Sequence, residues 1–197
     1  MDSDLAEAVQ ALKAIFEKRR IPASFGTQDD AGLAALKPNV RLTSRYSAFL
    51  RKADPVDVET ITPSERIRFI PASELLAEQR AYLEGDADRP AVDGWRKEWV
   101  VIAHSAMLGD PYFLDTTRPD AEGDCPVMTA MSGTDLKPVL CASSFASFIQ
   151  IVATAMEVAV DFAEDALDPD DEAIFREALS PKIRVIDQAA LREGHWT

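Results

Sequence analysis

Residues 99–116 read WVVIAHSAMLGDPYFLDT, and this stretch decides the fold. Trp99–Ala103 is a continuous apolar run, as expected for a strand buried on both faces of a sheet. Residues 109–111 are the turn-formers Gly, Asp and Pro, and Tyr112–Thr116 is a second strand-like stretch. Because short connections favour antiparallel neighbours, the segment predicts a hairpin at the centre of a sheet.

Further strands and helices are predicted on both sides of this hairpin. Short strands are expected within residues 55–70, and PVMTAM (126–131) and LKPVL (136–140) supply a third and fourth strand after the hairpin. Apolar residues at helical spacing predict four helices, at 4–20, 44–53, 71–84 and 144–166. The whole chain is therefore expected to form a single α+β domain: a twisted, mainly antiparallel sheet with flanking helices.

Local signals predict how several of these elements begin. Asp4 and Glu7 have the spacing of a capping box, and Pro71 suits the first turn of its helix. Residues 161–180 hold eight acids and one base, but they lack the central glycine and closing glutamate of a calcium loop. A helix start capped by Asp168 is predicted there instead, within an acidic helical extension, 163–197, whose tail adds an edge strand and a last helical turn.

Composition limits the classes of partner that the chain can bind and the cellular compartment in which it is expected. The formal charge is −13, with 34 acids against 21 bases, which argues against sequence-independent nucleic-acid binding. The acidic N-terminus does not resemble a signal peptide, and no apolar run is long enough to span a membrane, so a cytoplasmic location is expected. Cys125 and Cys141 are expected to be free thiols, because a reducing compartment disfavours disulfides.

The hairpin also contains residues that suggest chemistry. His104 and Ser105 are adjacent on a strand, so they should point to opposite faces and cannot form a catalytic pair. No nucleophile elbow, phosphate-binding loop or zinc-ligand pattern occurs, so no catalytic residue, cofactor or metal site is predicted. One enzymatic alternative remains, in which Asp110 and Asp115 hold a metal ion, although turn formation explains Asp110 more simply.

A series of short motifs appears in an order that resembles a known family. They are Tyr-x-x-Phe-Leu from Tyr46, Glu-Leu-Leu from Glu74, Gly-Asp at Gly109, Phe-Leu-Asp from Phe113, Pro-Val at Pro126 and Ser-Phe-x-x-Phe from Ser144. Over residues 36–155 the chain resembles the SUKH superfamily, the Smi/Knr type of domain. It departs from the pattern at 51–54, where the family carries Asn-Gly, and in the acidic extension beyond residue 163.

The resemblance implies a non-catalytic, protein-binding α+β domain. Many bacterial members resemble or are immunity proteins, which neutralise a cognate toxin, often a nuclease. Fungal relatives act as regulatory scaffolds, and this role is the alternative for the present chain. A basic toxin domain is the expected partner, since an acidic surface attracts basic proteins. Acids on loops or strand ends are the candidate contacts, each with ordinary solvated charge as its alternative: Asp86, Asp88, Asp110, Asp115, Asp120, Glu122 and Asp124.

Overall fold

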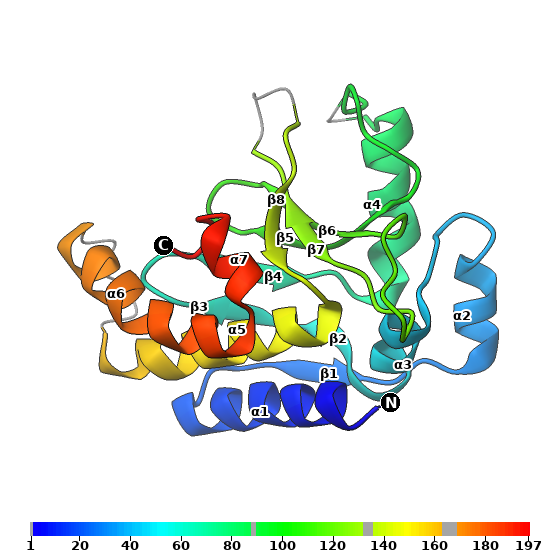
Figure 1. Cartoon of the computed structure of the whole chain (residues 1–197). Helices are drawn as coiled ribbons and strands as arrows, with labels where there is room; N and C mark the ends of the chain where they lie inside the picture. The colour runs from blue at the N-terminus through cyan, green and yellow to red at the C-terminus, as the bar shows by residue number, and fades with distance from the viewer. Residues whose placement is uncertain (1, 88–89, 132–135, 163–168) are drawn as a thin grey trace.

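The computed structural model describes residues 2–87, 90–131, 136–162 and 169–197. Six strands form one antiparallel sheet in the order in which they occur along the chain (Figure 1). They are β3 (Glu59–Ile61), β4 (Arg66–Phe69), β5 (Trp99–Ser105), β6 (Pro111–Asp115), β7 (Val127–Thr129) and β8 (Val139–Ala142). The α+β class and the antiparallel sheet predicted from the sequence are confirmed.

The hairpin of β5 and β6 lies at the centre of this sheet, as predicted. Its register pairs Trp99 with Asp115 and His104 with Pro111, with an irregularity between Val101 and Ala103. Every β5 residue except His104 is buried, because sheet neighbours flank the strand and helices cover both of its faces.

Alternation along β6 shows which helices cover each face. The Tyr112 ring packs on Phe148 of α5 (Phe145–Val158), while the next residue, Phe113, packs on Trp95, which contacts Tyr82 of α4 (Ala72–Glu84). Successive strand residues point to opposite faces, so α5 and α4 lie on opposite sides of the sheet. Helix α1 (Ser3–Arg19) packs along α5 at the bottom of Figure 1.

The remaining elements complete the layers around the sheet. A two-stranded ribbon pairs β1 (Ser24–Gly26) with β2 (Asp54–Asp57). Along the chain, α2 (Asp30–Leu36) and α3 (Ser44–Ala53) both lie between these two strands. After the single 3₁₀ turn Ala159–Asp161, α6 (Pro169–Ile186) packs on α5, and α7 (Gln188–Arg192) follows. None of the helices in the described parts of the chain is both long and apolar enough to cross a bilayer.

Four local predictions need correction. Asp4 and Glu7 form no capping box: Asp2 is the N-cap, it makes no side-chain cap, and Asp4 bonds Arg45 instead. The helix predicted to start in the Pro71 turn begins at Ala72, with Pro71 as its N-cap.

The third correction concerns the C-terminal extension. The predicted edge strand is wrong, because residues 182–186 continue α6, in which Phe175, Leu179 and Ile183 are buried at intervals of four. A helix does begin at Pro169 with acids in its first turn, as expected, while Asp168 lies outside the described residues. The helix predicted over 144–166 gives way to the 3₁₀ turn after Val158.

Candidate functional site

The acids predicted as partner contacts lie in three separate places. Asp86 is exposed just after α4, and Asp110 lies at the start of β6. The four from Asp115 to Asp124 follow the other end of β6, and Asp88 falls outside the described residues. Because a strand rises about 3.4 Å per residue, Asp110 and Asp115 are about 17 Å apart and cannot share one metal ion.

Two of the predicted contacts are buried, which corrects their assignment to the surface. Asp110 is 8% exposed and Asp124 is 1% exposed. Asp110 lies in the tight β5–β6 turn, where its carbonyl accepts from the Ser105 amide at 2.8 Å. Burial of this kind prevents either side chain from offering its charge to a partner.

The loop joining β6 to β7 is held in shape by its own carboxylates. Asp115 Oδ1 accepts from the Thr117 amide at 3.1 Å and from the Thr117 hydroxyl at 2.6 Å, as expected for a strand-end acid that binds loop amides. Asp120 Oδ1 accepts from the amides of Glu122 and Asp124 at 2.9 and 2.8 Å. These bonds fix the loop, because they satisfy backbone donors locally.

Asp124 fastens this loop to the N-terminus of α5. Its Oδ1 accepts from the amides of Cys125 (2.8 Å) and Phe145 (3.1 Å), and its Oδ2 accepts from Ala146 (3.2 Å). Ser144, the N-cap, accepts from the Ser147 amide, so together the two residues satisfy the first free donors of the helix. Burial raises the pKa of Asp124, opposed by these amides and by the charge of Arg45.

Arg45 of α3 brings the loop together with the N-terminus of the chain. Its guanidinium is 5% exposed, and its Nη1 donates to both carboxylate oxygens of Asp4, at 2.8 and 2.7 Å. Its Nη2 donates to Glu122, while its Nε makes no hydrogen bond and lies 3.5 Å from Asp2 and 3.8 Å from Asp124. With all four acids ionised, four carboxylates and one guanidinium leave an excess of three negative charges.

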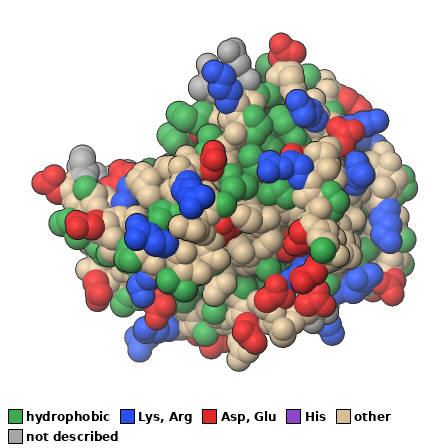
Figure 2. Space-filling view, in the orientation of Figure 1, with side chains coloured by type: hydrophobic (Ala, Val, Ile, Leu, Met, Phe, Trp, Pro, Cys, Tyr) green, Lys and Arg blue, Asp and Glu red, His purple; other side chains and the backbone are tan. Residues whose placement is uncertain are grey.

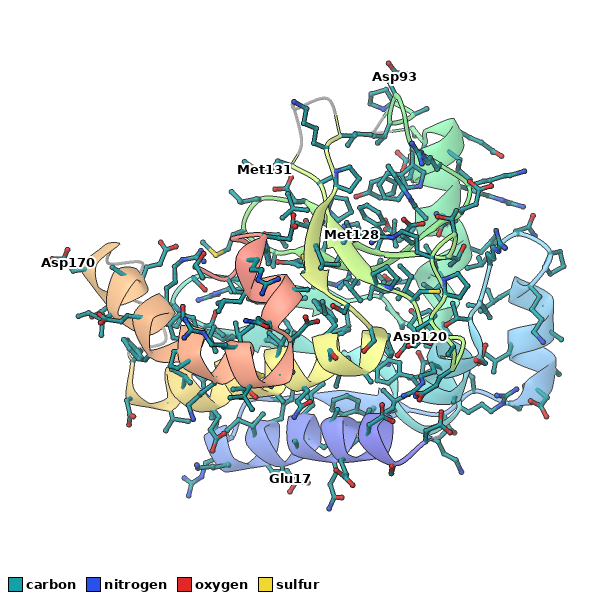
Figure 3. The ribbon with its side chains drawn as sticks, in the orientation of Figure 1. Glu17, Asp93, Asp120, Met128, Met131 and Asp170 are labelled. Carbon is teal, nitrogen blue, oxygen red and sulfur yellow. The ribbon has the colours of Figure 1, made fainter. Side chains whose placement is uncertain are left out.

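We call the exposed part of this cluster the acidic corner: Asp2, Asp4, Asp120 and Glu122. Figure 2 shows acidic side chains gathered at the lower right, near the N-terminus of Figure 1, and Figure 3 places Asp120 there. Partial burial opposes the shift, but the hydrogen bond and charge of Arg45 lower the pKa of Asp4. Asp4 therefore keeps its negative charge at neutral pH and below.

Only half of the acidic corner was predicted from the sequence. Asp120 and Glu122 were identified as loop acids, whereas Asp4 was assigned to a helix start and Asp2 was given no specific role. No local pattern marks Arg45 as their shared partner, because its acids lie 41 and 77 residues away along the chain. A buried arginine on a helix face was the missing signal, and burial requires the tertiary fold.

The residues that suggested chemistry are separated as predicted. His104 Nε2 lies 3.0 Å from Glu78 Oε2 on the α4 face, while the Ser105 hydroxyl donates to Glu65 at 2.8 Å. Across the described ranges, no three histidine, cysteine, aspartate or glutamate residues are grouped to hold a metal ion. Cys125 and Cys141 are free and buried, as predicted, and burial together with nearby acids raises the pKa of Cys125 to about 11.

Comparison with known proteins adds no identification. No protein-family model matches this chain, and none of the curated proteins matches it significantly. The geometry of the acidic corner therefore carries the functional proposal.

Proposed function

We propose that this chain is a non-catalytic protein-binding domain that uses the acidic corner to bind a basic protein surface. The observation that carries the proposal is the β6–β7 loop: Asp120 and Glu122 are exposed, yet the loop is fixed to α5 through Asp124 and to α3 through Arg45. A loop that is already ordered loses little conformational entropy on binding, so more of the contact energy appears as affinity.

Electrostatics favours a basic partner for the same corner. An excess of negative charge on one face raises the association rate with a positively charged surface and disfavours acidic competitors. The formal charge of −13 extends this attraction beyond the corner itself. These terms support fast, salt-sensitive association with a basic protein.

The resemblance to the SUKH superfamily suggests the class of partner. Immunity proteins of that family neutralise cognate toxins, many of them nucleases. A nuclease presents lysine and arginine around its active site to bind phosphate, which makes it a suitable partner for an acidic corner. We therefore propose a toxin of this kind as the partner.

Affinity capture from native cells followed by binding kinetics tests the proposal. The variant Asp120→Asn with Glu122→Gln removes two charges but keeps the acceptor oxygens that hold the loop. We expect about a 3- to 10-fold slower association with a captured basic partner and little change in dissociation, because rim charges act mainly on encounter.

Glu17→Gln with Asp93→Asn is the matched control, since both side chains are exposed and lie away from Asp120 in Figure 3. The control should slow association distinctly less. Equal effects of the two double variants, or binding that is unchanged between about 0.05 and 0.5 M salt, would overturn the acidic corner as the contact. Capture of metabolic enzymes alone would overturn the toxin partner.

A further inference from the structure

A second polar cluster lies in the interior, at the end of the sheet opposite the acidic corner. Glu65, in the β3–β4 turn, accepts at Oε1 from the Ser105 hydroxyl and the Arg66 amide, both at 2.8 Å. Its Oε2 accepts from the Tyr112 hydroxyl at 3.0 Å. Ser105 and Tyr112 are buried and Glu65 is half-buried, so this carboxylate links β4, β5 and β6 where access of water is reduced.

Residues 193–197, which follow α7, dock against this cluster (Figure 1, red). His195 Nε2 lies 3.1 Å from the Tyr112 hydroxyl, and the Trp196 indole donates to the Cys141 carbonyl at 2.8 Å. Arg176 of α6 donates to the His195 carbonyl at 3.1 Å. Contacts to β6, β8 and α6 thus hold the segment on the sheet.

The protons available in the cluster suit a neutral imidazole. Tyr112 has one hydroxyl proton: when it donates to ionised Glu65, its oxygen accepts from His195 Nε2–H. When Glu65 is protonated it can donate to Tyr112, which then donates to an unprotonated Nε2, with the ring proton on Nδ1. A neutral His195 fits both arrangements, whereas an imidazolium, which cannot accept a hydrogen bond, fits only the first.

Three elements pack against His195, namely α6, β6 and β8, and each places a charged or titratable group near it. Arg176 on α6 is cationic; Glu65 and Asp110 are acids that act through Tyr112 of β6; and Cys141 of β8 is a buried thiol with a raised pKa. Burial first, and then the charge of Arg176, lower the pKa of His195 to about 4. Docking therefore disfavours the imidazolium, which water would stabilise.

We propose that residues 193–197 form a proton-linked latch, which is docked on Tyr112 while His195 is neutral and is released when His195 is protonated. Release would expose the Trp196 ring and the part of the Phe148 ring that it faces, at a centroid distance of 6.5 Å. The latch is independent of the acidic corner and of the partner proposed for it.

The sign of the pH dependence follows from linkage. A released histidine has a pKa of about 6.5 and the docked one about 4, so docking is fully favoured above pH 6.5 and weakens as pH falls toward 4. The equilibrium constant for release should be about tenfold higher at pH 5.5 than at pH 7.5.

Two measurements on the full chain test the latch. The chain has only two histidines, so the variant His104→Gln leaves the His195 ring as a single imidazole signal in a proton NMR titration. We expect this signal to titrate near pH 4. Amide hydrogen exchange, corrected for intrinsic rates, should show about tenfold more opening of residues 190–197 at pH 5.5 than at pH 7.5, with β5 unchanged as the internal control.

Variants distinguish release of the latch from partial unfolding of the whole domain at low pH. His195→Phe keeps a ring but cannot titrate, so residues 190–197 should lose their pH dependence, whereas His104→Gln should retain it. Titration of docked His195 near pH 6.5, a parallel rise of exchange in β5, or an unchanged pH dependence in His195→Phe would each overturn the proposal.

Discussion

The carboxyl groups of Asp4 and Glu65, at opposite ends of the sheet, have pKa shifts of opposite sign. At the acidic corner, Asp4 is exposed beside the Arg45 guanidinium, and its pKa is lowered. At the latch, Glu65 is half-buried and accepts from two hydroxyls and an amide, and burial raises its pKa. An exposed acid beside a cation has a lowered pKa and stays charged, whereas a more buried acid has a raised pKa and is protonated more easily.

The largest effect should come from removing the cation. Arg45→Met leaves the carboxylates of Asp2, Asp4, Glu122 and Asp124 without their shared partner, and it should lower the free energy of unfolding by about 3 kcal/mol. Chemical denaturation measures this loss. The control Arg51→Met, in the same helix, removes an exposed ion pair with Asp30 and should cost no more than about 1 kcal/mol. Equal losses would mean that Arg45 is not the centre of the corner.

A smaller effect is expected at the point where the corner meets the core. Asp124→Ala removes the acceptor for the amides of Phe145 and Ala146 at the N-terminus of α5, at a cost of about 2 kcal/mol. Thermal unfolding should show the loss. Asp124→Asn keeps one acceptor oxygen and should recover part of it, and no difference between the two variants would argue against the capping role.

The smallest expected effect is a difference in sign between the pH dependences of stability of two variants, Asp4→Asn and Glu65→Gln. Asp4, with its lowered pKa, stabilises the protein above pH 4, so Asp4→Asn should be less stable than wild type at pH 7, by no more than about 1 kcal/mol, with the gap closing as pH falls through the folded pKa. Glu65, with its raised pKa, favours folding most at low pH. Glu65→Gln should therefore gain relative to wild type as pH rises from 4 to 7.

Urea unfolding at several pH values measures both trends. The same slope for the two variants would contradict the contrast between the ends of the sheet, because both carboxyl groups would then experience similar surroundings.

Features that depend on residue spacing within one helix, strand or turn were predictable from the sequence. The buried run of β5, the turn at residues 109–111 and the helix faces that include Leu5, Leu12 and Phe148 all follow from spacing within one element. The error in the C-terminal extension came from too short a window: KIRVI alone resembles a strand, whereas the spacing of Phe175, Leu179 and Ile183 indicates a helix.

By itself, the sequence determined the central hairpin, the amphipathic helices and the negative charge, because each depends on composition or on neighbours a few residues apart. Only the tertiary structure decided which acids are exposed. It also decided that Arg45 pairs with acids that precede and follow it in the sequence, and that His195 contacts Tyr112, 83 residues away. Burial and ion pairing depend on which distant segments the sheet and helices bring into contact, and no local pattern encodes that choice.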